Sequence, residues 1–300
     1  MKNKTKALIY TFLSIFAWSF IPVVSSFAQQ KLDASNFLLY SNIFSLIAIY
    51  LYAKIFKYRL NFNKKIVKQT AILGFLGTFL YYVCIYFGYK FANPIEVIII
   101  QYLWPVLIVI LSAFLLHEKL NTKKSISVIL GFLSVIIVIT KGDVTLFTFN
   151  FPLGLGIVFL GALSFALFSI LSKKMDIDPI SGTLLLFAWG VLFSFIWVLC
   201  TFGLTPIKGD SLFYIALNGI FINGISYIWW IEAMRLWDAS KVSVFVYATP
   251  ILGTLWLILL SNQQLFTSYA IALIFVIIAG ILTIWERDEK HTFIKQNRQR

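Results

Sequence analysis

Residues 94–116 read PIEVIIIQYLWPVLIVILSAFLL, an apolar run in which Glu96 is the one charged side chain. An α-helix rises 1.5 Å per residue, so about 20 apolar residues are enough to cross the hydrocarbon core of a bilayer. The run lacks the alternation of apolar and polar residues that a strand of a membrane barrel shows. It therefore predicts a membrane-spanning helix, and Pro105 near its middle predicts a kink in that helix.

Similar runs fill the rest of the chain. Of its 300 residues, 60% are hydrophobic and 12% are charged, whereas a soluble domain carries about 25% charged residues. We therefore predict an all-α membrane protein with ten transmembrane helices. The first run is longer than the 7–15 apolar residues of a signal peptide, so we interpret it as a span. The ten predicted spans cover residues 7–28, 37–56, 70–89, 94–116, 125–140, 153–172, 180–202, 212–234, 241–260 and 268–286.

The basic residues indicate the orientation of these spans. With the N-terminus in the cytoplasm, 21 Lys and Arg residues fall in cytoplasmic segments and 4 in outer segments. Cytoplasmic loops of membrane proteins carry such an excess of Lys and Arg, and an odd number of spans would remove it. The pattern predicts that both termini are cytoplasmic. It also accounts for the net charge of +13 without a nucleic-acid partner.

A shift of 145 residues aligns the sequence with itself without a gap. The pairs that then coincide include Gly74 and Gly219, Tyr82 and Tyr227, Tyr102 and Tyr247, and Pro105 and Pro250. We predict a first five-helix repeat at residues 1–144, a second at 145–289 and a basic cytoplasmic tail at 290–300. Because five is odd, the second repeat enters the membrane from the opposite side. Inverted repeats are typical of secondary transporters, whose substrate site lies between the halves near the midplane.

Two prolines occupy matching positions in the fourth and ninth predicted spans. Pro105 and Pro250 each remove one backbone hydrogen bond and clash with the carbonyl four residues earlier, which belongs to Gln101 or Val246. A freed carbonyl in lipid needs a partner or a water-lined cavity. The pair therefore favours a hinge or a cavity at the centre of the bundle, and a simple packing kink is the alternative. Pro22 in the first span is a third candidate hinge.

Polar and aromatic residues form stripes on several predicted helices. The eighth span carries Asn223, Tyr227 and Trp230 on one face, and the third span carries Thr78 and Tyr82 at the matching positions. Such stripes favour either a substrate site or hydrogen bonding between packed helices. The candidate substrate-binding residues are Trp18, Thr78, Tyr82, Glu96, Gln101, Tyr102, Trp104, Asn223, Tyr227, Trp230 and Tyr247.

Few ionisable residues lie within the spans. Glu96 is about one turn inside the outer end of the fourth span, and it is the candidate group for binding a proton or cation. Glu232 and Arg235 are three residues apart in the eighth span, a spacing that predicts an ion pair. Asp238 and Lys241 have the same spacing and predict a second one.

Other residues that carry chemistry in enzymes have no matching partners in this chain. His117 and Glu118 end the fourth span at the cytoplasmic surface, where we expect Glu118 to be solvated, and no second His follows at the spacing of a zinc site. Cys84 and Cys200 lie inside apolar runs, where a buried thiol is the expected role. We predict no metal site, no cofactor and no catalytic residues.

The residues and spans together resemble a known family. The two inverted five-helix units resemble the EamA-type branch of the drug/metabolite transporter superfamily over nearly the whole chain. Four short motifs resemble the bacterial aromatic amino-acid exporter group. They are Ile95-Glu96-Val97, Tyr102-Leu103-Trp104-Pro105, Ala17-Trp18-Ser19 and Thr249-Pro250. The resemblance implies a basket of helices in the inner membrane, open alternately to either side and exporting amino acids or related small metabolites.

The resemblance also implies that Glu96, Tyr102, Trp104 and Pro105 line or shape the central cavity. The sequence departs from the family after the ninth span, where Asn262-Gln263-Gln264-Leu265 stands in place of a common acidic residue. The predicted partners are a small-molecule substrate and the lipid bilayer.

Three hypotheses for function follow from these observations. In the first, an alternating-access exporter hydrogen-bonds its substrate through Gln101, Asn223 and Tyr227, and Trp18, Trp104 and Tyr247 flank the apolar part of the substrate. The second is a proton- or sodium-coupled multidrug or metabolite transporter on the same fold. The third is a multi-span membrane enzyme, which would depend on His117 or His291 as its base. The first is favoured.

Overall fold

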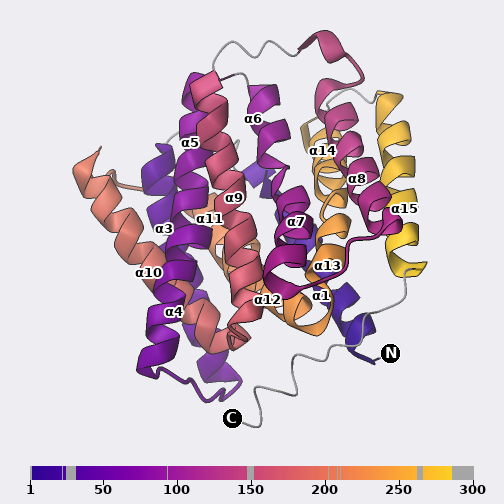
Figure 1. Cartoon of the computed structure of the whole chain (residues 1–300). Coiled ribbons are helices and arrows are strands. Elements are labelled where there is room, and N and C mark those ends of the chain that lie inside the picture. Colours follow the sequence, from indigo (N-terminus) through magenta and orange to yellow (C-terminus); the bar gives the residue numbers. More distant parts are fainter. Residues whose placement is uncertain are drawn as a thin grey trace.

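The computed structural model is a bundle of helices that run in roughly the same direction (Figure 1). It describes residues 2–21, 23–24, 32–92, 94–146, 152–201, 203–207, 209, 211–261 and 266–285. Throughout this part of the chain every regular element is a helix, as the hydropathy pattern predicts.

The α-helices are α1 (Lys2–Ser19), α3 (Ala34–Ile55), α4 (Lys64–Gly74), α5 (Tyr81–Phe91), α6 (Pro94–Gln101), α7 (Trp104–Leu116), α8 (Thr122–Thr140), α9 (Pro152–Lys174), α10 (Pro179–Cys200), α11 (Ser211–Leu217), α12 (Ser226–Leu236), α13 (Ala239–Phe245), α14 (Ala248–Ser261) and α15 (Ser268–Trp285). Two π-helical segments, η1 (Phe75–Leu80) and η3 (Asn218–Ile225), and one 3₁₀ turn, η2 (Val144–Leu146), complete the set.

Nine helices within the described residues are long and apolar enough to cross a membrane. They agree with nine of the ten predicted spans to within a few residues, except that the third begins at Lys64 and not at residue 70. Its first turn is polar and basic, and Asn63 caps it by accepting a hydrogen bond from the Ile66 amide at 2.9 Å. Hydropathy alone misses such a turn because it lies outside the apolar run. The first predicted span overlaps α1 and ends among residues that are not described.

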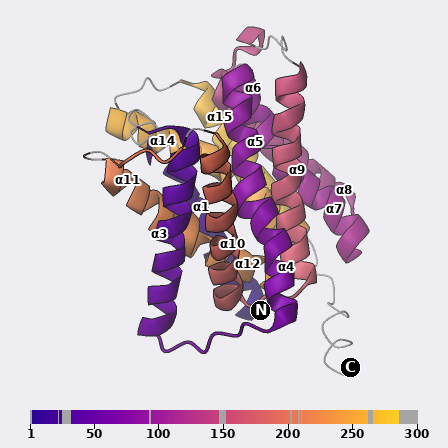
Figure 2. The same cartoon turned by 90° about the vertical axis from the view of Figure 1, so that its left-hand side faces the viewer.

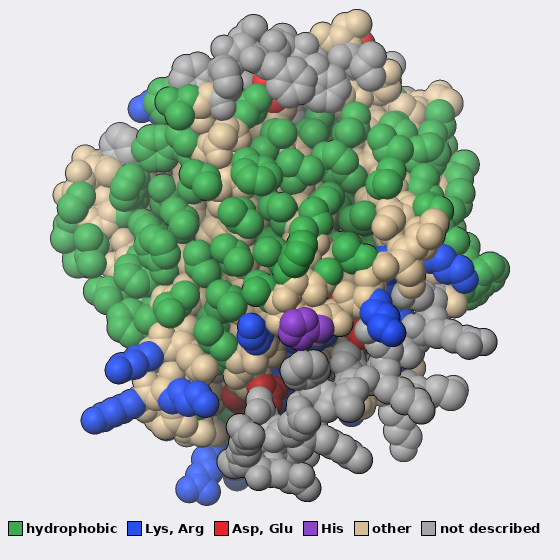
Figure 3. Space-filling model, in the orientation of Figure 1, with side chains coloured by type: hydrophobic (Ala, Val, Ile, Leu, Met, Phe, Trp, Pro, Cys, Tyr) green, Lys and Arg blue, Asp and Glu red, His purple; other side chains and the backbone are tan. Residues whose placement is uncertain are grey.

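Hydrophobic side chains cover the middle of the molecule in a broad band, and Lys and Arg side chains gather below it (Figure 3). The start of α1 and the end of α15 lie together at that lower end, where the Lys4 ammonium donates to the Ile284 carbonyl at 3.0 Å (Figure 1). An apolar belt with charged residues at its edge is the surface expected of a protein surrounded by lipid.

The fourth and ninth spans are each broken where the prolines predict. The first break separates α6 from α7 and places Pro105 in the first turn of α7. The second separates α13 from α14, and Thr249 donates its amide to the Val246 carbonyl at 2.8 Å. The carbonyl that Pro250 releases is thus satisfied by a tighter turn within the backbone. Pro22 lies outside the described residues.

Several structural features recur at a spacing of 145 residues. Helix α3 and helix α10 have bounds that differ by this number at both ends, and so do the breaks of the fourth and ninth spans to within a residue. The π-helical segments η1 and η3 both end at this spacing, in the third and eighth spans. Such π-helical insertions are rare and occur often at functional sites, so their paired positions draw attention to the residues around them.

The same spacing relates two helix caps. Asp33 accepts hydrogen bonds from the Ser35 and Asn36 amides at the start of α3, and Asp178 accepts one from the Ser181 amide at 2.7 Å at the start of α10. These two helices pack side by side (Figure 2). Their first turns are therefore fixed by equivalent carboxylates.

Asp178 also joins two loops, because it accepts a hydrogen bond from the Tyr58 hydroxyl at 2.5 Å. Partial burial and this carboxylate raise the pKa of Tyr58 to about 12, so the tyrosine stays a donor at any physiological pH. We expect Asp178→Ala to lower the free energy of unfolding by about 1–2 kcal/mol, the usual cost of a lost N-cap. Thermal melting in detergent measures this loss.

The matched control for this cap is Asp143→Ala. Asp143 accepts from the Thr145 amide at 2.9 Å in an exposed turn, where it caps no transmembrane helix. Its loss should leave the melting temperature unchanged, so equal shifts for the two variants would contradict a special role for Asp178.

Candidate functional site: a central aromatic cluster

Five aromatic side chains from four helices meet inside the bundle. Trp18 of α1, Trp104 of α7, Phe165 of α9, and Tyr227 and Trp230 of α12 are each less than 10% exposed. We call this group the central aromatic cluster. Its helices belong to both halves of the chain, so the cluster lies where the halves meet.

The rings pack mainly edge to face. The Trp104 ring lies 4.9 Å from Phe165, 5.6 Å from Trp230 and 6.2 Å from Trp18, measured between centroids, and all three contacts are T-shaped. Trp18 also contacts Trp230 at 5.2 Å. Each such pair contributes about 0.5–1.5 kcal/mol beyond the area that it buries. The cluster is an apolar surface of fixed geometry, made of side chains that carry no charge.

Serine residues hold two of the three indoles in place. The Trp18 Nε1–H donates to Ser226 Oγ at 2.8 Å, and the Trp230 Nε1–H donates to Ser169 Oγ at 3.0 Å. The third indole differs, because Trp104 Nε1 makes no hydrogen bond with another described residue. The N–H of an indole is a hydrogen-bond donor, so Trp104 offers a donor that a bound molecule could use.

A chain of hydrogen bonds connects the cluster to the two π-helical segments. The Tyr227 hydroxyl donates to the Gly77 carbonyl of η1 at 2.9 Å, and the Tyr82 hydroxyl donates to Asn223 Oδ1 of η3 at 3.1 Å. The two tyrosine hydroxyls lie 3.3 Å apart. The segment η1 therefore supplies an acceptor to Tyr227, which follows η3, and η3 supplies an acceptor to Tyr82, which follows η1.

The structure brings some predicted residues together and separates others. Trp18, Trp104, Tyr227 and Trp230 meet in the cluster, with Tyr82 and Asn223 beside them. Gln101 joins from its edge, because its Nε2 donates to the Tyr81 hydroxyl at 2.7 Å and the Tyr81 ring lies 4.9 Å from Phe165.

Four predicted residues lie elsewhere. Thr78 donates to the Gly74 carbonyl at 2.7 Å and packs against α10, which is a structural contact. Tyr247 is fully buried in a second cluster with Val109 and Val135, and Tyr102 packs against that cluster. The ring contacts of Trp104 among the described residues are with Trp18, Phe165 and Trp230, and include neither Tyr247 nor Tyr102.

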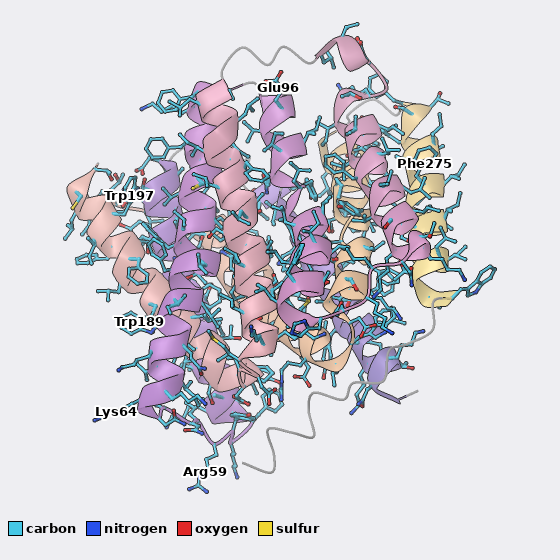
Figure 4. The ribbon with its side chains drawn as sticks, viewed as in Figure 1. Arg59, Lys64, Glu96, Trp189, Trp197 and Phe275 are labelled. Carbon is cyan, nitrogen blue, oxygen red and sulfur yellow. The ribbon has the colours of Figure 1, made fainter. Side chains whose placement is uncertain are left out.

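Glu96 is the fourth of these residues. It is 2% exposed in the first turn of α6, at the upper end of the molecule and far from Arg59 and Lys64 (Figure 4). A carboxylate in the first turn is favoured by the helix dipole, and Glu96 also has interactions within the protein.

Sequence reasoning missed Phe165, Ser169 and Ser226. A phenylalanine and two serines in apolar spans have no pattern that distinguishes a site from packing, because small hydroxyl residues are common between membrane helices. The match of Phe165 with Phe20 at the spacing of 145 residues was the available signal.

Both predicted ion pairs are present. The Arg235 Nη1 lies 3.1 Å from Glu232 Oε2, and the Lys241 Nζ lies 3.4 Å from Asp238 Oδ2. The second pair is fully buried. Its burial could not be predicted, because polar residues lie beside it in the sequence.

The expectation that Glu118 is solvated is wrong. Its side chain is 7% exposed and its carboxylate is hydrogen-bonded to Ser240. Burial by itself would raise the pKa of Glu118, but the Lys173 ammonium and the hydrogen bonds from Ser240 outweigh burial and lower it. The carboxylate is therefore ionised, and folding places it against Ser240, which is 122 positions later in the sequence.

Broken spans, paired π-helical segments and a charge-free aromatic cluster characterise a multi-span helical membrane protein. The model of the EamA-like transporter family matches residues 5–140 and 152–285, and the chain belongs to that family. It is thus a multi-pass membrane protein of a transporter family.

Several curated proteins are similar to this chain. It is 28% identical over 188 residues to the uncharacterized transporter YyaM of Bacillus subtilis, which covers 60% of this chain and 61% of that protein. It is 28% identical over 189 residues to the aromatic amino acid exporter YddG of Ancylobacter novellus, which covers 62% and 65%. These two matches thus span somewhat less than two thirds of each relative.

Other matches extend over the full length. An uncharacterized transporter of Archaeoglobus fulgidus is 23% identical over 295 residues, which covers 95% of this chain and 96% of that protein. A crystal structure aligns with a TM-score of 0.81 at 19% identity and covers 99% of both chains, which supports the same fold.

Proposed function

We propose that this protein is an alternating-access transporter that exports aromatic amino acids or related small metabolites across the cytoplasmic membrane. The observation that carries the proposal is the central aromatic cluster, with the unpaired indole N–H of Trp104 inside a charge-poor bundle. Aromatic edges and faces suit a planar ring. The similarity to a protein named as an aromatic amino acid exporter supports the same substrate class.

The proposed mechanism uses two inverted repeats of five spans, at residues 1–144 and 145–289. The 145-residue spacing of the π-helical segments and of the span breaks supports this arrangement. The pair of Tyr82 and Tyr227 supports it too, because these residues are 145 positions apart and their hydroxyls lie 3.3 Å from one another. Two equivalent residues in contact are expected on the axis that relates two repeats. In the proposed arrangement this axis therefore runs beside the aromatic cluster.

Substrate then binds near the midplane, where the halves meet. The broken fourth and ninth spans supply two places at which a half can bend, since backbone hydrogen bonds are already interrupted there. The distribution of Lys and Arg favours cytoplasmic termini. The lower end in Figure 1 is accordingly assigned to the cytoplasm.

Counterflow in proteoliposomes tests the proposed function. Vesicles loaded with unlabelled tryptophan should accumulate labelled tryptophan, phenylalanine and tyrosine faster than labelled lysine or glutamate. Protein-free vesicles give the background. If all five amino acids accumulated only at the background rate, the proposed substrate class would be overturned. If a proton or sodium gradient increased the rate of tryptophan transport, the ion-coupled alternative would be favoured.

Tyr227→Phe tests the hydrogen-bond chain that supports the cluster. The variant keeps the ring but loses its bond to the Gly77 carbonyl, an interaction of about 0.5–1.5 kcal/mol. We expect the apparent affinity for tryptophan in counterflow to weaken by about two- to tenfold. Tyr50→Phe is the control, because Tyr50 is 45% exposed on α3. An unchanged affinity in a folded Tyr227→Phe protein would remove this hydroxyl from the site.

A further inference from the structure

The carboxylate of Glu118 holds the start of α13. Its Oε1 accepts from the Ala239 amide at 2.7 Å, and its Oε2 accepts from the Ser240 amide at 3.0 Å and from Ser240 Oγ at 2.6 Å. The Lys173 ammonium lies 3.3 Å from Oε1 and also donates to the Trp237 carbonyl at 2.5 Å. We call Glu118, Lys173, Ser240 and these backbone groups the Glu118 latch.

The latch connects three separate helices at one end of the molecule. Glu118 follows α7, Lys173 lies in the last turn of α9, and Ser240 lies in the first turn of α13. His117, whose backbone is in the left-handed conformation at φ 56°, ends α7 ahead of Glu118. The same end carries the start of α1, because Lys4 lies 5.1 Å above the ring of Trp237. The latch therefore lies at the end assigned to the cytoplasm.

The element that the latch holds is one half of the broken ninth span. Helix α13 packs against α7 and is separated from α14 by the break at Val246 and Tyr247. A short helical segment that ends at a break can tilt without disturbing the rest of its span. Its packing against α7, α8, α15 and α1 holds its length, and Glu118 binds its first turn from the other half of the chain.

The charges of the latch and its surroundings are buried and paired in this conformation. Lys173 balances Glu118, and the buried pair of Asp238 and Lys241 lies beside them. Removing one partner of a buried ion pair leaves an uncompensated charge, which is strongly unfavourable. When the native protein opens at this end, water reaches both Glu118 and Lys173 and solvates their charges. The pair is therefore tolerated in both the closed and the open conformation.

The sequence has no equivalent charge set in the positions 145 residues away. Glu118 corresponds to Gln263, Asp238 to Asn93 and Lys241 to Glu96. Gln263 and Asn93 lie outside the described residues, so this comparison concerns sequence alone. The two ends of the transporter therefore differ in the charged residues available to close them.

We propose that the Glu118 latch is a gate lock that biases the resting transporter toward a conformation closed at the cytoplasmic end. The inference rests on the proposed alternating access. It adds a specific residue set and a direction of bias, since a charged lock at one end shifts the equilibrium away from the state open at that end.

Thiol labelling tests the lock without any substrate, so its failure can be told apart from failure of the proposed function. Cys84 and Cys200 are first replaced by alanine, and Ser169→Cys then places one thiol beside Trp230. A membrane-impermeant maleimide is added to the cytoplasmic face of inside-out vesicles. We expect Glu118→Gln and Lys173→Met to increase the labelling rate on the order of tenfold.

Ser240→Ala is a milder variant, because it leaves no buried charge unpaired. It removes one hydrogen bond to Glu118, and we expect a smaller increase in labelling. Asp176→Asn is the control, because Asp176 pairs with Arg235 on the surface with its side chain 76% exposed. Thermal melting checks that each variant is folded. Unchanged labelling in folded Ser240→Ala and in either charge variant would overturn the proposal, and so would an equal increase in Asp176→Asn.

Discussion

Trp104→Ala should reduce counterflow of tryptophan by at least about tenfold at limiting substrate concentration, the largest functional effect that we expect of one side chain in this protein. Trp104 contacts the rings of Trp18, Phe165 and Trp230, and its Nε1–H makes no hydrogen bond with another described residue. The alanine variant loses both the ring and the donor. A loss of about 1.4 kcal/mol in binding is enough for a tenfold effect.

The same substitution is expected to lower stability, so two further variants separate the effects. Replacing a buried tryptophan by alanine typically costs about 3–5 kcal/mol because it leaves a cavity. Trp104→Phe retains most of the ring contacts and removes the indole donor, so it should melt close to the native protein and still show weakened counterflow.

Trp285→Ala is the matched control for tryptophan loss. Trp285 ends α15 and is 74% exposed, so its removal should leave both melting and counterflow unchanged. If folded Trp104→Ala and Trp104→Phe transported like the native protein, Trp104 would have no part in the site.

Gly219→Ala should destabilise the fold by about 3 kcal/mol, the upper part of the range for overpacked interiors. A Cβ at this position would lie 2.5 Å from the Ser41 carbonyl oxygen and 2.5 Å from Phe44 Cβ, both of which belong to α3. Neither atom is the mobile end of a side chain, so α3 itself would have to move. The Ser45 hydroxyl donates to the Gly219 carbonyl at 2.7 Å, and that hydrogen bond would be strained too.

Two other glycines provide a matched variant and a control for this prediction. Gly74 is its counterpart in the third span, where a Cβ would meet the Leu186 carbonyl oxygen at 2.8 Å, so Gly74→Ala should show a similar loss. Gly156 has no atom within 4 Å of an added Cβ, and Gly156→Ala should leave the melting temperature in detergent unchanged or slightly raised. A Gly219→Ala protein as stable as Gly156→Ala would show that α3 and η3 are less closely packed than this structure indicates.

The spans were predictable because each depends on local composition. Residues 94–116 are apolar enough to cross a bilayer whatever surrounds them, and Pro105 interrupts a helix through its own covalent ring. The breaks of the fourth and ninth spans accordingly fall where the prolines predict. The π-helical segments were not predictable, because no side chain in the third or eighth span marks an extra residue in a helical turn.

The candidate site was predictable only in part. Trp18, Trp104, Tyr227 and Trp230 stood out as aromatic residues deep in predicted spans, and they do meet. Tyr247 is also an aromatic residue within a predicted span, yet its ring packs outside the central cluster, in the space that Gly131 leaves open. The face that a helix turns toward the interior of the bundle depends on its neighbouring helices. Aromatic residues are common on both faces of membrane helices, so their presence does not identify the interior face.

The sequence by itself determined that the chain spans a membrane many times, where most spans lie and where two of them break. These properties follow from hydrophobicity and backbone chemistry over about 20 residues, which act without distant partners. Only the tertiary structure decided that Trp104 meets Trp230, that Tyr82 meets Tyr227, and that Glu118 is buried against α13. Those contacts join residues more than 100 positions apart, and their formation depends on how closely the helices approach and which faces they share.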